Sequence, residues 1–311
     1  MTAIPLRRRR GLSPLARREA RWALIFLSPW IIGFFAFLLI PMIATFLFTF
    51  TNINLNQAEP LRFVGLDNYA KVLQDQQTWE SLGVTLKFAL FALPVAVILP
   101  FLVALLLGSR HLKGAALFRI LFFMPYVVPF VAGVLIWQSM LNPDSGWIAL
   151  VLKSIGIADP PDWLQDPTFV YPGLVILSLW GIGGGVIVYL AGLKGIPTEL
   201  YDAARIDGAG WFASLRHVTL PMLSPVIFYT LILAIVELLQ YFLVPLVLNQ
   251  GTGEPGGTTL FLNLYLYKNF FTYQDMSYGA TLAWLLFGVT LLITIVLFRT
   301  SRRWVYYAGE R

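Results

Sequence analysis

Six long apolar runs, separated by polar stretches, dominate the chain from residue 22 to residue 298. Each run holds about twenty or more residues with few charges, the length that a helix needs to cross a hydrocarbon layer about 30 Å thick. The pattern therefore predicts an all-α integral membrane protein with six transmembrane helices. The predicted spans are 22–50, 82–107, 117–140, 168–193, 222–248 and 278–298.

The composition supports this class of protein. Hydrophobic residues make up 58% of the chain and charged residues 12%, about half the charged share of an ordinary soluble domain. The first apolar run is too long for a signal-peptide core and lacks a small-residue cleavage site, so we expect it to remain as a span. The chain contains no cysteine, which excludes disulfides, thiolate catalysis and cysteine-bound metal.

Basic residues are distributed unevenly between the two faces that six spans define. Seventeen of the 22 lysines and arginines fall on the face that carries both termini, whereas ten of the 16 acids fall on the opposite face. Because cytoplasmic loops are enriched in lysine and arginine, both termini are predicted to be cytoplasmic. The net charge of +6 thus reflects topology and does not indicate nucleic-acid binding. The predicted parts are a basic tail (1–21), a transmembrane domain (22–298) and a C-terminal tail (299–311).

A polar segment of about two dozen residues lies between the fourth and fifth predicted spans. A short helix is predicted to begin near Glu199, with acids in its first turn, where the helix dipole favours them. The Asp207-Gly208 pair breaks this helix, and apolar residues between Trp211 and Val218 recur at the spacing of a second, amphipathic helix. Such a helix–turn–helix suits docking onto another protein. The alternative is a solvated loop that only joins two spans.

The same segment resembles the EAA loop in the membrane subunits of binding-protein-dependent ABC importers. That pattern is Glu-Ala-Ala, three residues, Gly, and a hydrophobic stretch ending in Leu-Pro. Here it reads Asp202-Ala203-Ala204, Gly208 and Leu220-Pro221, with Asp in place of the usual Glu. The resemblance extends over most of the chain, to the carbohydrate and glycerol-3-phosphate branch that includes maltose-type permeases. It rests on the segments 63–73, 117–129, 135–157, 189–209 and 302–310.

The resemblance implies a multi-pass permease subunit of a bacterial or archaeal cell membrane. Its implied partners are a second homologous permease, two ATP-binding subunits, an extracytoplasmic solute-binding protein, the sugar and membrane lipid. The chain has no GxxxxGK[ST] phosphate loop, so ATP and Mg belong to the partner subunits, and no cofactor or enzymatic activity is expected of this chain. The segment 194–221 becomes the coupling loop that contacts an ATP-binding subunit. The residues implied in this contact are Glu199, Asp202, Ala203, Ala204, Arg205, Asp207, Gly208, Trp211, Phe212 and Leu215.

Candidate residues for a solute path lie within the predicted spans. Glu237 is the one acid well inside a span, where an ionisable group is costly and marks a functional site. Gln240 and Tyr241 follow at i+3 and i+4, on the same helical face, and suit a hydroxyl-rich solute. The alternative is a protonated Glu237 that bonds a neighbouring helix. The weaker candidates are Trp137, Gln138 and Tyr189, which packing or interfacial anchoring also explains.

Other residue patterns point to no further site. The glycines at 181 and 183–185 lie inside an apolar span, so they favour close packing or bending of helices and not nucleotide binding. His111 and His217 are isolated, and the acids between 144 and 166 fit no calcium loop, so no metal site is predicted.

Two rival classes of protein and one rival class of solute agree less well with the sequence. A secondary transporter would share six spans but would not need the coupling loop, and no inverted repeat of a broken helix is evident. A membrane enzyme would need a convergent set of catalytic groups that the chain does not supply. A neutral sugar or oligosaccharide is favoured over glycerol 3-phosphate, because phosphate is usually bound by Arg or Lys and the basic residues within the predicted spans, Lys87 and Arg119, lie near the span ends.

Overall fold

The computed structural model describes residues 13–57, 59–109 and 112–306, which are helical apart from turns, loops and one isolated bridge between Thr51 and Phe63. Most of the basic N-terminal tail, His111 and the last five residues lie outside this description. The α-helices are α1 (Pro14–Phe34), α2 (Ile40–Phe48), α3 (Asp67–Gln74), α4 (Gln76–Gly108), α5 (Ala115–Phe123), α6 (Phe130–Met140), α7 (Trp147–Ser154), α8 (Val170–Ser178), α9 (Gly183–Lys194), α10 (Thr198–Ile206), α11 (Trp211–Ser214), α12 (Leu220–Leu239), α13 (Leu243–Asn249), α14 (Leu262–Tyr267) and α15 (Met276–Ser301). The π-helical turns are η1 (Phe35–Leu39), η4 (Leu215–Thr219) and η5 (Lys268–Thr272), and the 3-10 turns are η2 (Met124–Val127) and η3 (Leu179–Gly181).

Four helical segments of the described chain are long and apolar enough to cross a membrane. They are Pro14–Phe48, Gln76–Gly108, Trp211–Asn249 and Met276–Ser301. A fifth span is possible if α8 and α9, which meet at a bend of 57°, are counted together. The bend falls in the glycine-rich segment expected to favour bending. A Cβ on Gly185 would lie 3.0 Å from Pro100 of α4, so these helices pack closely at that point.

The third predicted span, 117–140, is not one continuous helix. It is divided into α5, the 3-10 turn η2 and α6, and only the 11-residue α6 is an apolar helix of intermediate length. Pro125 and Pro129 lie at the break, and a proline removes a backbone donor and clashes with the preceding turn. Pro94 and Pro100, in contrast, lie inside α4, which is continuous. The six-span count therefore stays a prediction.

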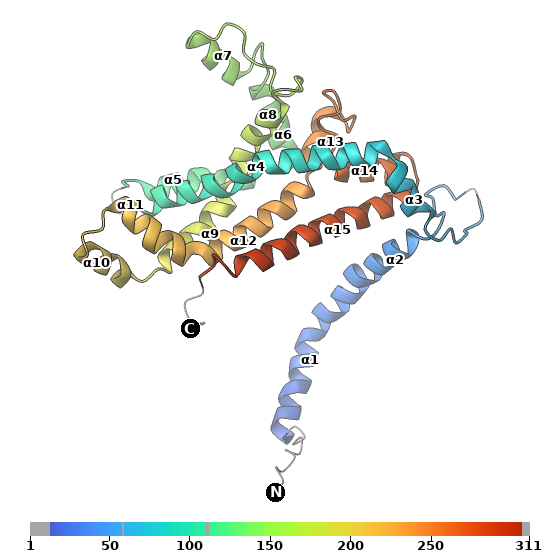
Figure 1. The fold of residues 1–311 in the computed structure, drawn as a ribbon, viewed down its shortest axis with the longest axis horizontal. Coiled ribbons are helices and arrows are strands. Elements are labelled where there is room, and N and C mark those ends of the chain that lie inside the picture. The colour runs from blue at the N-terminus through green and yellow to red at the C-terminus, as the bar shows by residue number, and fades with distance from the viewer. Residues whose placement is uncertain (1–12, 58, 110–111, 307–311) are drawn as a thin grey trace.

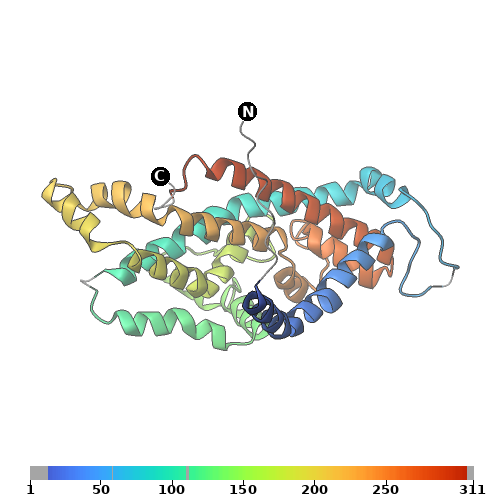
Figure 2. The same ribbon diagram turned by 90° about the horizontal axis from the view of Figure 1, so that it is seen from below.

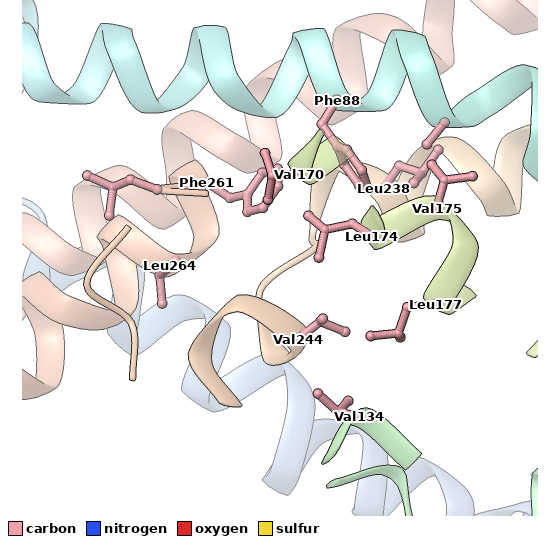
Figure 3. Packing of buried hydrophobic residues seen from close by; sticks show 12 residues of the cluster. Phe88, Val134, Val170, Leu174, Val175, Leu177, Leu238, Val244, Phe261 and Leu264 are labelled. Atoms are coloured by element: carbon pink, nitrogen blue, oxygen red, sulfur yellow. The ribbon is translucent and has the colours of Figure 1, made fainter. Parts of the chain in front are cut away.

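The helices α4, α9, α12 and α15 form the central bundle (Figure 1). α4 packs on α9 and α12, and α12 packs on α15. One core cluster, which joins α4 to α8, α13 and α14, is shown in Figure 3 around Phe88, Leu174 and Phe261. The α10 end and the α3 end of the bundle lie opposite one another in both views of the ribbon (Figures 1 and 2).

Two further segments lie partly away from this bundle. α1 diverges from it (Figure 1) and contains no buried residue. The stretch 141–167, expected to be a loop, contains α7, which projects from the body. Trp147 and Val151, one helical turn apart, are 75% and 60% exposed. The apolar run from Trp147 to Leu152 is a local helix signal that the prediction missed. The polar stretch between the first two predicted spans contains the short helix α3.

Candidate functional site

The segment 194–221 forms the predicted helix, turn and second helix at the α10 end of the bundle. α10 ends in a turn in which the N–H of Gly208 bonds the Arg205 carbonyl and the N–H of Ala209 bonds the Ala204 carbonyl, at 3.0 and 2.8 Å. This pattern satisfies the last helix carbonyls and requires a left-handed residue. Gly208 has φ of +77°, so glycine is the residue that fits there without strain.

The predicted contact residues of this loop are mostly at the surface. Trp211 and Phe212 are 73% and 66% exposed, and Asp202 accepts a 2.9 Å hydrogen bond from Arg205 on the same helix. Glu199, Ala203, Asp207 and Gly208 are also exposed, whereas Ala204 and Leu215 are half-buried. Ile206, which the sequence did not single out, is 86% exposed. Exposed apolar side chains rimmed by charges are typical of a protein-contact surface.

A hollow of about 700 Å³ separates the coupling loop from the ends of the bundle helices. It is lined from α4, α9, α10, α11 and η4. Tyr201 and Thr219 line the same hollow, and their hydroxyl oxygens lie 3.0 Å apart. The loop is thus attached to the bundle across a partly open space.

A second cavity, of about 630 Å³, lies where α6, η3, α12 and α13 meet. Three of the six solute-path candidates, Trp137, Glu237 and Tyr241, line it. Trp180 also lines it and packs edge-on against Trp137, with ring centroids 6.3 Å apart. Most of the remaining lining is apolar, and it includes the hydroxyl-bearing Ser178. The cavity combines aromatic rings, one carboxylate and a few hydroxyl groups.

The other three candidates lie elsewhere. Tyr189 is buried between α4, α9 and α12, and its hydroxyl bonds Thr230 at 2.7 Å. Gln138 and Gln240 do not belong to the cavity lining, and the Gln240 backbone carbonyl accepts a 2.8 Å hydrogen bond from Asn263. Helical spacing put Glu237, Gln240 and Tyr241 on one face, but α12 ends at Leu239, so the spacing no longer holds at residues 240 and 241.

That stop is a break in the helix at residues 240–242, between α12 and α13. Tyr241 lies in the break, and its buried hydroxyl finds no hydrogen-bond partner among the described residues. Glu237 lies in the last turn of α12 and is exposed. An unpaired buried hydroxyl in a cavity wall is costly and favours a bound polar group or water there.

At the α3 end, a carboxylate ties several helices together. One oxygen of Asp75 accepts hydrogen bonds from Thr78, Tyr278 and Tyr265 at 2.6, 2.6 and 2.9 Å, and the other accepts from the Gln77 N–H at 3.1 Å. Burial opposes ionisation of Asp75, but these hydrogen bonds outweigh it and hold its pKa below the usual value. The same environment, burial first and then the bond donated to Asp75, raises the pKa of Tyr265 to about 12. Sequence reasoning missed this cluster, whose tyrosines lie about 200 residues from Asp75.

Comparisons with known proteins bear on the whole chain. Residues 77–306 match the family described as the inner membrane component of binding-protein-dependent transport systems. The chain is 35% identical over 287 residues to a probable ABC transporter permease protein of Bacillus subtilis, with 92% of each chain covered. It is 32% identical to the trehalose/maltose transport system permease protein of Thermococcus litoralis, covering 93% of this chain and 97% of the other.

The fold matches a solved structure as well. A chain from the crystal structure of a bacterial ABC transporter involved in the import of the acidic polysaccharide alginate superimposes with a TM-score of 0.75. The two are 24% identical, and the match covers 94% of this chain and 99% of that one. The likeness at this identity concerns the fold, and it agrees with the resemblance found in the sequence.

Proposed function

This chain belongs to the family of inner membrane components of binding-protein-dependent transport systems, and from this premise we propose that it is a permease subunit importing a sugar or oligosaccharide. It is a multi-pass protein of the cell membrane. Relatives named as permeases for trehalose and maltose, for lactose and for arabinooligosaccharides support the solute class. These permeases are 30% to 32% identical to this chain.

In the proposed topology the chain crosses the membrane six times, with the broken segment 115–140 as the third crossing. The breaks near Pro125 and Pro129 are compatible with this, because non-helical backbone is tolerated in a membrane where protein covers it or a cavity adjoins it. Both prolines line the 630 Å³ cavity. Both termini and the α10 end would then face the cytoplasm, as the distribution of basic residues indicates.

The coupling loop is proposed to dock on one of two ATP-binding subunits. Support comes from the exposed apolar side chains of Ile206, Trp211 and Phe212 beside the charged face of α10. ATP and Mg would bind to those partners, because the chain has no phosphate-binding loop. A second permease would complete the path, and a solute-binding protein would deliver the sugar at the α3 end.

The observation that carries the solute proposal is the joint placement of Trp137, Glu237 and Tyr241 around one cavity. Aromatic faces cover the apolar faces of a sugar, while the carboxylate accepts hydrogen bonds from its hydroxyl groups. No Lys or Arg lines this cavity in the described part of the chain, which disfavours glycerol 3-phosphate and other anionic solutes.

The test replaces the carboxylate and follows uptake in proteoliposomes that contain the complete transporter. Glu237→Leu is expected to lower ATP-driven uptake of the sugar about tenfold or more, the size of a lost charged hydrogen bond. Maltose, trehalose, lactose and an arabinooligosaccharide are the solutes offered, with glycerol 3-phosphate as the anionic arm. Gln240→Leu, a polar residue in the same break but outside the cavity lining, is the matched control. Equal uptake by the Glu237 and Gln240 variants would contradict the assignment of the cavity.

A further inference from the structure

The coupling loop contacts the bundle through a pair of hydroxyl groups, those of Tyr201 and Thr219. A neighbouring hydrogen bond of Thr219 determines which of the two is the donor. Thr219 is 4% exposed, and its hydroxyl donates a 3.4 Å hydrogen bond to the Ser214 carbonyl. A threonine hydroxyl has one hydrogen, so the 3.0 Å contact with Tyr201 has the tyrosine as donor. Tyr201 lies on α10 and Thr219 on the π-helical turn η4. The bond therefore crosses from one element to the other.

Apart from this bond, α10 meets the bundle by packing on η4. The Asp202–Arg205 pair is internal to α10, so it does not connect that helix to the bundle. The 700 Å³ hollow lies between α10 and the ends of α4 and α9. α10 packs on η4, the turn that holds Thr219. A displacement of α10 can consequently reach the bundle at η4.

The turn η4 leads without interruption into α12. Its widened geometry is shown by the Leu220 N–H, which bonds the Leu215 carbonyl five residues earlier. Such π-helical turns are rare and occur often at functional positions within helices. α12 runs from Leu220 to Leu239 and carries Glu237 in its last turn. A push on Thr219 thus acts at the base of the helix that forms part of the solute cavity.

We propose that the Tyr201–Thr219 hydrogen bond is the strut that transmits movement of the coupling helix to α12. Tyr201 is then a positioning residue for transport, set apart from the surface that docks on the ATP-binding subunit. This inference rests on the proposed function, because it takes α10 as the element that the ATP-binding subunit moves. Its own content is the route of that movement inside this chain.

The labelling rate of a thiol in the cavity can distinguish a hydrogen bond that transmits movement from one that only stabilises the loop. The chain has no native cysteine, so Ser178→Cys places one thiol in the cavity wall. A membrane-impermeant thiol reagent is applied to the reconstituted transporter with and without ATP and orthovanadate, and the ratio of labelling rates is measured. ATP hydrolysis of the same samples reports assembly with the ATP-binding subunits.

Tyr201→Phe and Thr219→Val each remove one hydroxyl with little change in shape. Each is expected to shrink the nucleotide-dependent change in labelling about fivefold, as for one lost hydrogen bond, while ATP hydrolysis continues. The double variant should do no more than Thr219→Val alone, because Tyr201→Phe removes only the shared bond, whereas Thr219→Val also removes the bond to the Ser214 carbonyl. Thr230→Val is the matched control: it removes another tyrosine–threonine hydroxyl pair, Tyr189–Thr230, which links α12 to α9 and not to α10. Its labelling change is expected to remain.

Three results would overturn the proposal. If Tyr201→Phe and Thr219→Val keep the full labelling change, movement takes another route, and the proposed function survives. If they abolish ATP hydrolysis together with assembly, the bond has a structural role only. If the Ser178→Cys reporter alone shows no response to nucleotide, the coupling assigned under the proposed function fails, and this inference fails with it.

Discussion

At the α3 end of the bundle, side chains about 200 residues apart in sequence meet around Asp75, and Lys71 bonds Asp275 at 2.9 Å beside them. At the α10 end, the coupling loop borders a 700 Å³ hollow, and the hydroxyl of Tyr201 bonds that of Thr219 at the base of α12. One end joins the starts of α4 and α15 through a carboxylate with four donors. The other leaves a short helix with exposed apolar side chains.

This difference suits a transporter driven from one side. Polar networks that are fully satisfied rigidify the segments they join, whereas sparse contacts leave a segment free to move as a unit. Damage at the α3 end should therefore appear first as lost stability. Damage at the α10 end should appear first as lost coupling between ATP hydrolysis and transport. The following variants test this separation, from the largest expected effect to the smallest.

Asp75→Ala should be the most destabilising change. It leaves the hydroxyl groups of Tyr265 and Tyr278 without the acceptor they share, and Tyr278 is buried. A cost of about 2–3 kcal/mol is expected for losing hydrogen bonds to a charged acceptor. Thermal unfolding of the purified transporter measures it. Glu80→Ala, an exposed carboxylate in the first turns of α4, is the control and should change the midpoint little.

Acidification should reproduce part of that loss reversibly. The pKa of Asp75 is lowered in the folded protein, so its ionised form favours folding. This contribution is fully present above the unfolded pKa of about 3.9 and disappears as pH falls through the lower folded pKa. Below about pH 4, the thermal unfolding midpoint should decrease more steeply with falling pH in the natural chain than in Asp75→Ala. Parallel curves would contradict the assigned role of the carboxylate.

Gly208→Val should strain the turn between α10 and α11. A branched residue at φ of +77° costs about 1–2 kcal/mol, because its Cβ approaches the backbone carbonyl. Within the described residues nothing lies within 4 Å of a Cβ at this position, so the strain is conformational and not a packing clash. ATP-driven uptake should fall, and the thermal midpoint should fall less than it does in Asp75→Ala. Gly208→Asn should retain more uptake, since Asn tolerates the left-handed region better.

Arg205→Ala should have the smallest effect on stability. Its ion pair with Asp202 joins two side chains that are 68% and 65% exposed on one helix, a geometry that contributes about 0.3–0.5 kcal/mol. The thermal midpoint should remain within error of that of the natural chain. ATP hydrolysis by the assembled transporter, measured in parallel, shows whether the guanidinium also contacts the ATP-binding subunit. A large loss of thermal stability would contradict the separation of the two ends.

Local features of the fold were readable in the sequence. Gly208, between two helical patterns, predicted the helix–turn–helix of the coupling loop. A turn of this type needs a residue in the left-handed conformation, which glycine adopts most easily. The apolar runs predicted most of the long helices. The helix of residues 117–140 was expected to be continuous, although Pro125 and Pro129 were visible. Prolines inside α4 cause no break, so a proline alone does not determine whether a span is interrupted.

The candidate site was predictable only in part. Glu237 was identified by its charge inside an apolar run, and the structure places it beside Trp137 and Tyr241. Gln240 shared their helical spacing but lies outside the cavity lining, because the helix ends before Tyr241. The Asp75 cluster could not be predicted, since its partners come together only through tertiary packing. A polar residue at the start of a helix is common and gives no sign of distant donors.

The break at residues 240–242 allows α12 to tilt as a rigid rod about this point, the fulcrum, which lies near the middle of the molecule. The helix has 20 residues, a length of about 30 Å at 1.5 Å per residue. A tilt of only about 10° about the fulcrum moves the far tip by about 5 Å, close to the rise of one helical turn. Glu237 and Tyr241, near the fulcrum, would shift far less. A large movement at the end proposed to contact the ATP-binding subunit would thus become a small movement at the cavity proposed to bind the sugar.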